Sequence, residues 1–354
     1  MGCTELAKEI LGGRDIPAVH EWLEDMAPSL ESACEASRRT RFFVPLAVKE
    51  GALLKDAGPD LTYLRHLTRA LHVRSAIRLQ SGDIDGAAAD MTAIFRLARL
   101  SSQQQSLVCL LFGIAMEDMA TGAAENIAIY GNLPPERALG FAEDIGKLPR
   151  VGDWTGAMNY ERLIHLEMTW QVASGQGTGA SPPVQMAGLD FNEYARRVNW
   201  YFDRITGIKR STEPWPDHQT QSASRVFALR AGGILTLGVF TREMVDRQMG
   251  YLTPTWGRSN DLFHQVQVRK DLVRIAMLLA AFHAETGSFP DNLDTLASRY
   301  RVAIPNDPFG DGPFKYDRDG QGYVLYSMSE YGFPKGRGPS PKVTIRSATQ
   351  PNGV

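Results

Sequence analysis

Apolar residues recur at intervals of three and four along residues 61–128, the spacing that gathers them on one face of a helix. The first two apolar sets are Leu64, Leu67 and Leu71, followed by Ala87, Met91, Ile94 and Ala98. Between them lies a turn sequence, in which Gly82 can end one helix and Asp85 can cap the next. The pattern therefore predicts a helical hairpin.

A third apolar set predicts another helix, which ends before the Gly-Asn-Leu-Pro-Pro sequence at residues 131–135. The set consists of Leu107, Leu110, Leu111 and Ile114. The proline pair can open a fourth helix over residues 136–145. Residues 76–98 resemble one unit of a tetratricopeptide-type array, although no second copy follows at a fixed period. We therefore expect residues 1–150 to form a domain of helical hairpins.

Residues 151–256 have a different character, because five of the six tryptophans lie there. Glycine and proline interrupt this stretch at residues 174–183 and 212–218, which are expected to be loops. A helical pattern resumes over residues 223–249. The prediction is an aromatic-rich, mostly helical region with long loops.

A long amphipathic helix is predicted after Gly257, because apolar residues again follow one another at spacings of four and three. Its apolar positions are Val268, Leu272, Ile275, Leu279 and Phe282. The motifs that follow are Gly-Ser-Phe-Pro at 287–290, Leu-x-x-Leu at 293–296, Pro-Asn-Asp-Pro-Phe-Gly at 305–310 and Leu-Tyr-Ser at 325–327. Residues that favour strands at 314–316 and 323–327, separated by a turn, predict a β-hairpin.

This order of helix and motifs resembles the C-terminal domain of the type II secretion major pseudopilins. The resemblance covers about residues 266–338 and implies an α+β module of extracytoplasmic lineage. It does not imply pilus assembly, because other sequence occupies the place of the apolar N-terminal helix through which pseudopilins polymerise. Family members bind calcium in the loop after the Leu-Tyr-Ser strand. Residues 328–338 carry one acid and two bases, so we expect no calcium at this loop.

The whole arrangement, with a helical body first and the module last, also resembles bacterial helical proteins that carry a pseudopilin-like module. That likeness gives an architecture and no activity. The predicted fold is mainly α with a C-terminal α+β module, in which tetratricopeptide-like hairpins precede a long helix and a small antiparallel sheet. The module is expected over residues 257–340, and residues 341–354 are expected to form a flexible tail.

Composition and charge narrow the possible partners. The 354 residues, 43% of them apolar, are enough for more than one core. The 38 basic side chains nearly cancel the 40 acidic ones, so no overall field favours nucleic acid or an anionic membrane. One predicted helix has a basic flank, which we interpret as solvated surface. It consists of Arg65, Arg69, Arg74 and Arg78.

Neither the cysteines nor the histidines have the spacing of a metal site. The three cysteines are Cys3, Cys34 and Cys109, and one disulfide is possible without being implied. We therefore predict no metal and no cofactor.

The longest apolar runs, residues 107–116 and 231–240, are shorter than the roughly 20 residues that cross a bilayer. No transmembrane segment is predicted, and the first residues do not read as a signal peptide. Two interpretations of location stay open. The protein is either exported or periplasmic, with a leader outside this chain, or it is cytoplasmic; a lipid anchor at Cys3 is a further alternative.

None of the common motifs of serine hydrolases, zinc proteases or nucleotide-binding proteins is present in the sequence. The most suggestive cluster is Asp153, Glu161, His165 and Glu167. Glu161 and His165 are four residues apart and share a helix face, so the carboxylate could orient the imidazole for proton transfer. The competing interpretation is structural: Glu161 pairs with Arg162 or Arg197, and His165 is a partly buried helix residue.

Aromatic side chains near this cluster are candidates for binding a sugar ring. They are Trp154, Tyr160, Trp170, Trp200 and Trp215. Hydrolysis of a glycoside needs two carboxyl groups about 5 to 10 Å apart. Further candidate carboxylates are Asp190, Glu193 and Asp203.

These observations predict a binding or scaffold protein whose ligand is a small molecule, a carbohydrate or a protein. The alternative is a glycoside hydrolase that uses paired carboxylates in the aromatic region. A deep pocket that gathers Glu161 and a second acid beside tryptophan would favour the enzyme. Acids held in salt bridges would favour the binding protein.

Overall fold

Helices account for most of the described chain, which the computed structural model covers over residues 2–44, 61–174, 189–207, 236–310, 312–320, 322–327 and 343–347. The helices are α1 (Cys3–Leu11), α2 (Pro17–Ser37), α3 (Thr62–Gln80), α4 (Ile84–Ser101), α5 (Leu107–Tyr130), α6 (Pro135–Lys147), α7 (Trp154–Ala173), α8 (Phe191–Ile205), α10 (Leu237–Thr286) and α11 (Leu293–Tyr300). The strands are β1 (Asn306–Asp307), β2 (Gly312–Pro313), β3 (Lys315–Asp319), β4 (Gly322–Ser327) and β5 (Val343–Ser347). The prediction of a mainly helical chain with a small C-terminal antiparallel sheet is confirmed.

The predicted hairpin is formed by α3 and α4. Gly82 follows the end of α3 with a φ of 82°, a left-handed conformation that glycine adopts without strain. The predicted cap was wrong by two residues, because Asp83 rather than Asp85 accepts a hydrogen bond from the Gly86 N–H, at 2.9 Å. Asp85 lies within the first turn, where its carboxylate instead forms an ion pair with Arg137 of α6.

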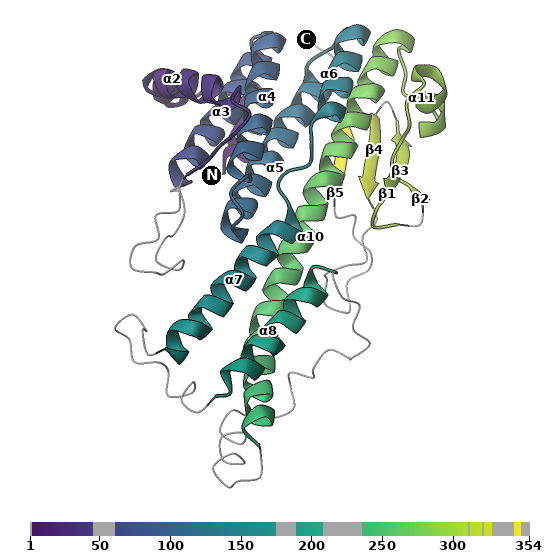
Figure 1. Cartoon of the computed structure of the whole chain (residues 1–354). Coiled ribbons are helices and arrows are strands. Elements are labelled where there is room, and N and C mark those ends of the chain that lie inside the picture. Colours follow the sequence, from purple (N-terminus) through teal and green to yellow (C-terminus); the bar gives the residue numbers. More distant parts are fainter. Residues whose placement is uncertain are drawn as a thin grey trace.

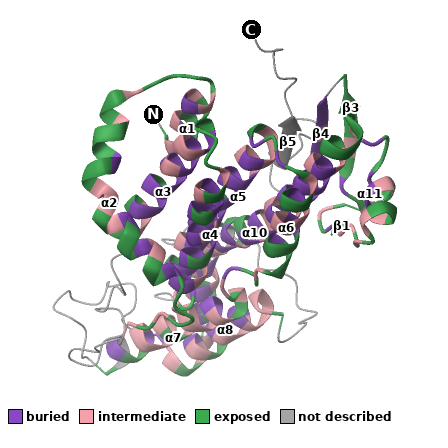
Figure 2. Cartoon of the chain, turned by 90° about the horizontal axis from the view of Figure 1, so that it is seen from above, coloured by how far each residue is buried: buried purple, intermediate pink, exposed green. Residues whose placement is uncertain are grey.

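Helix α5 is the central helix of the body. It packs against α3, α4 and α10, and Figure 2 shows it with buried positions along much of its length. By length and composition it is the one helix in the described part of the chain that could cross a membrane, yet 72% of its apolar stretch is buried inside the protein. Such burial is the environment of a core helix.

Helix α10 is 50 residues long, about 75 Å at the helical rise of 1.5 Å per residue. Figure 1 shows it running the length of the molecule, with the body and the sheet beside its C-terminal half and α8 beside its N-terminal half. The sequence predicted two helices, over 223–249 and after Gly257. The structure has one continuous helix from Leu237, so the predicted boundary at 256–257 falls inside it; residues 223–235 lie outside the described residues.

Two hydrophobic cores meet along α10, and they explain why the helix continues. Its N-terminal half buries Phe240, Met249 and Trp256 in one core, together with side chains of α7 and α8. Its C-terminal half buries residues from Val268 to Ala281 in the other, together with the helical body and the sheet. Tertiary packing on both sides therefore outweighs the low helix propensity of Gly257.

The C-terminal module contains the predicted β-hairpin, because β3 and β4 pair antiparallel with Lys315 opposite Tyr326. A third strand, β5, pairs antiparallel with the other edge of β4. Residues 343–347 were predicted to be part of a flexible tail, and that prediction was wrong. Ile345 of β5 is fully buried in the larger core, and the burial of this side chain stabilises the pairing of β5 with β4.

The Pro-Asn-Asp-Pro-Phe-Gly motif is tied to the Leu-Tyr-Ser strand by a buried carboxylate. Asp307 is 3% exposed and Ser327 is fully buried. The Ser327 hydroxyl lies 2.7 and 2.9 Å from the two Asp307 carboxylate oxygens, and the Phe309 N–H donates to Oδ1 at 3.0 Å. The aspartate thus orders its own loop and holds that loop against β4.

We predict that Ser327→Ala lowers the free energy of unfolding by about 1 to 3 kcal/mol, because it leaves a buried carboxylate without its hydroxyl donor. The measurement is a urea denaturation midpoint. Ser298→Ala, at an exposed position of α11 in the same module, is the control and should change stability by less than about 0.5 kcal/mol. Equal effects of the two substitutions would contradict this account.

Candidate functional site

The structure places Glu161 and His165 one turn apart on α7, as predicted, but their hydrogen bonds differ from the expected arrangement. The His165 ring Nδ1 lies 2.8 Å from the Glu161 backbone carbonyl oxygen. The Glu161 carboxylate accepts from the Leu107 N–H at the start of α5, at 3.3 Å. The carboxylate therefore binds the open end of a neighbouring helix.

His165 lies in an aromatic environment that accounts for its orientation. Its ring centroid is 5.6 Å from that of Phe202 and 5.8 Å from that of Trp256. Burial raises the pKa of the Glu161 carboxyl, while the Leu107 N–H and His165 offset part of the rise. A carboxyl with a raised pKa beside a histidine suits proton transfer. This carboxylate, however, already accepts the hydrogen bond from the Leu107 N–H at the start of α5.

The other candidate carboxylates of the aromatic region are held in ion pairs or helix caps. Asp190 caps α8 by accepting from the N–H groups of Asn192 and Glu193. The Glu193 carboxylate pairs with Arg242 at 2.9 Å, and Asp203 pairs with Arg162 at 2.9 Å. The alternative in which Glu161 pairs with Arg162 or Arg197 is wrong. Arg162 instead pairs with Asp203, and Arg197 pairs with Asp246 at 2.6 Å.

The predicted aromatic platforms are spread along the helices. Trp154 and Trp170 lie 16 positions apart on α7, about 24 Å along the axis. Trp154 packs near Phe263, whereas Trp170 is 57% exposed. The guanidinium groups of Arg197 and Arg204 lie over the Trp200 ring, 4.1 and 5.0 Å from its centroid. Tyr160 is half-buried on α7, and Trp215 lies outside the described residues.

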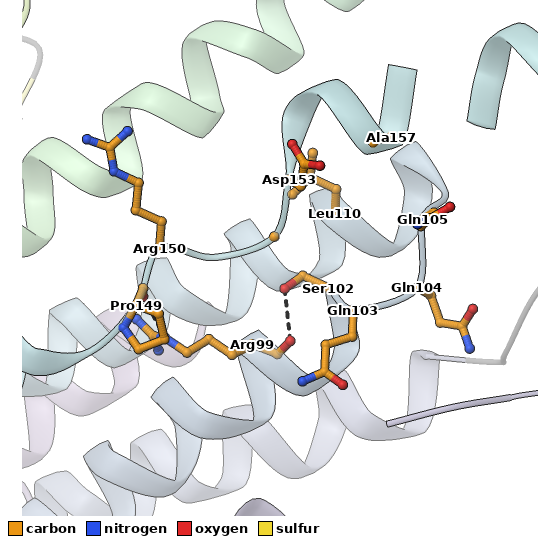
Figure 3. Close-up of a pocket in the computed structure, with 12 residues that line it drawn as sticks. Arg99, Ser102, Gln103, Gln104, Gln105, Leu110, Pro149, Arg150, Asp153 and Ala157 are labelled. Atoms are coloured by element: carbon orange, nitrogen blue, oxygen red, sulfur yellow. Dashed lines mark hydrogen bonds between the residues drawn. The ribbon is translucent and has the colours of Figure 1, made fainter. Parts of the chain in front are cut away.

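A pocket of about 320 Å³ lies beside this region, between the α4–α5 connection and the α6–α7 connection (Figure 3). It is lined by Arg99, Ser102, Gln103, Gln104, Gln105, Leu110, Pro149, Arg150, Gly152, Asp153, Gly156 and Ala157. Among the predicted site residues, Asp153 is the one that lines it. The pocket therefore brings Asp153 together with a different set of residues from the one that the sequence suggested.

Asp153 has a structural role as well as a place in the pocket wall. Its Oδ1 accepts from the Thr155 N–H at 3.0 Å, in the first turn of α7. The wall residue immediately before it, Gly152, has a φ of 55°, and a Cβ there would lie 2.4 Å from Leu110 Cδ1. The wall therefore requires glycine at position 152 for both backbone and space. Arg150 points away from Asp153 in Figure 3.

The opposite wall is fixed by glutamine side chains of the α4–α5 connection. The Gln103 amide donates to the Thr40 carbonyl at 3.0 Å and accepts from the Phe42 N–H at 2.7 Å. The Gln104 amide donates to the Val44 carbonyl at 3.1 Å. These bonds attach the chain after α2 to the edge of the pocket.

Behind the pocket lies a buried charge cluster that the sequence analysis missed. The Arg99 guanidinium donates to the Pro149 carbonyl at 2.7 Å and to the Glu117 carboxylate at 3.4 Å. The Lys270 ammonium donates to the Leu148 carbonyl at 3.2 Å and lies 4.0 Å from the same carboxylate. Glu117 is fully buried. The available signal was the occurrence of acidic residues, Glu117 among them, within the otherwise apolar sequence of α5.

The arginine flank was predicted to be solvated surface. That prediction was wrong for three of its four members, which contact a buried aspartate or an aromatic ring. The Arg74 and Arg78 guanidinium groups lie 2.6 and 2.9 Å from the carboxylate of Asp90, which is 1% exposed. The Arg65 guanidinium lies 5.7 Å from the Phe112 ring centroid. Arg69 is the exposed member. A buried aspartate on α4 accounts for the difference, because such a charge needs paired donors.

Within the described residues, no group of three or more His, Cys, Asp or Glu side chains could hold a metal ion. The predicted absence of calcium concerns residues 328–338, which lie outside the described residues. No protein-family model matches the chain, and comparison with curated proteins and with solved structures finds no match either. The pseudopilin likeness therefore depends on the motifs themselves and stays a prediction.

We predict that Gly152→Ala destabilises the protein by about 1 to 3 kcal/mol, because alanine is strained at a positive φ and its methyl group meets Leu110. Thermal unfolding measures the change. Gly140→Ala in α6 is the matched control, since no atom lies within 4 Å of the added methyl group. It should stabilise the protein by about 0.5 to 1 kcal/mol. A Gly152→Ala variant as stable as the wild type would refute this description of the wall.

Proposed function

We propose that the chain is an extracytoplasmic binding or scaffold protein that takes a small polar ligand in the pocket described above. One observation carries the proposal: the described lining contains a single carboxylate, Asp153, and the candidate acids outside it serve ion pairs or helix caps. Glycoside hydrolysis by the usual route needs two carboxyl groups facing one bond. The arrangement supports binding over hydrolysis.

The lining indicates the class of ligand. The lining includes the Gln105 amide and the Asp153 carboxylate, together with the apolar side chains of Leu110 and Ala157. Hydrogen-bonding groups mixed with apolar groups suit a hydroxyl-rich molecule, such as a short saccharide. Gln105 is exposed, so its amide is accessible to a ligand.

The scaffold part of the proposal rests on the C-terminal module. Its motifs resemble those of the pseudopilins, and that resemblance supports an extracytoplasmic location. The Asp307–Ser327 hydrogen bonds give the Pro-Asn-Asp-Pro-Phe-Gly and Leu-Tyr-Ser motifs a shared physical role. Because α10 belongs to both cores, the module and the helical body are joined as one structural unit.

Binding can be tested with a charge-removing substitution that keeps the helix cap. Asparagine caps helices as well as aspartate does, so Asp153→Asn should leave α7 intact. We expect calorimetry with a panel of mono- and disaccharides to show binding by the wild type that weakens at least about tenfold in Asp153→Asn, the effect of losing one charged hydrogen bond of about 1.4 kcal/mol or more. Asp144→Asn, at an exposed position of α6, is the control.

Hydrolysis should be measured on the same proteins with chromogenic glycosides and esters. We expect no turnover by the wild type. Turnover that is lost in Glu161→Gln or His165→Ala, while the circular dichroism spectrum is unchanged, would overturn the proposal in favour of the glycoside hydrolase alternative. The absence of both binding and turnover across the panel would overturn the assignment of a saccharide-like ligand.

A further inference from the structure

The α6–α7 connection forms one wall of the pocket and is held in place by two cations. Arg99 approaches the Pro149 carbonyl from α4, at 2.7 Å. Lys270 approaches from α10, with its ammonium 3.2 Å from the Leu148 carbonyl and 3.5 Å from the Pro149 carbonyl. Both cations therefore converge on the backbone of one short connection.

Two cations at one carbonyl repel each other, and Glu117 of α5 is the charge that offsets this repulsion. Its Oε1 faces both Arg99 at 3.4 Å and Lys270 at 4.0 Å. The Arg99 and Lys270 side chains are only 11% and 9% exposed, so water contributes little screening. The second carboxylate oxygen, Oε2, is buried without a hydrogen-bond partner in the described structure. Glu117 is thus held by charge more than by hydrogen bonds.

Other charged groups near the cluster lie on its margin. Lys270 faces Asp271 of its own helix and Arg150 of the α6–α7 connection, of which the first favours its charge and the second opposes it. From the other helices packed against α5, α3 contributes His72 at the Met119 carbonyl and α7 contributes Glu161 at the Leu107 N–H. Glu117 is therefore the carboxylate that lies between Arg99 and Lys270.

We propose that Glu117 is the positioning residue of the pocket, and that its protonation releases the α6–α7 connection from Arg99 and Lys270. This inference rests on the proposed function, since it concerns the wall of the same pocket. With Glu117 charged, both cations stay at the Leu148 and Pro149 carbonyls. With Glu117 neutral, two poorly solvated cations face each other without an anion, and separation of the connection from one of them relieves the repulsion.

The direction of the pKa shift places the protonation of Glu117 at a higher pH than that of an ordinary glutamate. Burial raises the pKa of the Glu117 carboxyl, and Arg99 and Lys270 offset only part of the rise. The carboxyl therefore becomes neutral, as pH falls, above its ordinary value of 4.5. Because this raised pKa means that the folded protein holds the proton more tightly than the unfolded chain, protonation of Glu117 favours the folded state overall. Protonation of Glu117 thus lowers the local order of the α6–α7 connection while it raises the free energy of unfolding of the whole protein.

Hydrogen exchange of the ligand-free protein tests the proposal. The readout is the protection of a peptide spanning residues 148–153, expressed relative to an unstructured peptide at the same pH. We expect wild-type protection to fall about tenfold as pH drops from 7 toward 4.5, the scale of a local opening. Glu117→Gln, which keeps the shape and removes the charge, should show the low protection already at pH 7 and little dependence on pH.

Glu125→Gln is the matched control, because Glu125 pairs with Arg269 across the same two helices without touching the connection. It should reproduce the wild-type profile. Protection that is equal in wild type and Glu117→Gln at every pH would overturn the proposal. If Glu117→Gln does not fold, the wild-type profile decides: constant protection between pH 7 and 4.5 overturns it. Exchange is measured without ligand, so a failure to bind saccharides would count against the proposed function alone.

Discussion

The packing of both halves of α10 into hydrophobic cores is the constraint on which the rest of the structure depends. Its two halves complete two different cores, one built with α7 and α8 and the other with the helical body and the sheet. The hydrophobic effect over so long a surface fixes the axis around which the other elements are arranged, and it keeps Gly257 within a continuous helix.

Charged groups are buried where these layers meet, and their arrangement differs from that of a typical surface. Arg99, Glu117 and Lys270 come from three different helices and lie next to the pocket wall. Removing such charges from water costs several kcal/mol each, so the position of each charge in the cluster depends on the other two. The Arg74–Asp90–Arg78 group follows the same rule between α3 and α4.

Local features of the fold could be predicted from the sequence, because periodicity and turn residues act over short distances. The α3–α4 hairpin, the opening of α6 by prolines and the β3–β4 hairpin all follow from such signals. The continuity of α10 and the addition of β5 depend on packing between distant segments, and no local pattern encodes them. The same limit applies to the site. Asp153 could be singled out from its neighbours, whereas the Arg99, Glu117 and Lys270 cluster exists only after α4, α5 and α10 have packed together.

A helix that is part of two cores also acts as a spacer. Because α10 is about 75 Å long along its path and is packed on both halves, it sets the separation between whatever is attached to the α7–α8 end and whatever is attached to the sheet end. A flexible linker would permit a range of distances and would incur an entropic cost on simultaneous binding. Here both ends pack against one helix, so a partner that contacted both would meet them at the separation that α10 sets.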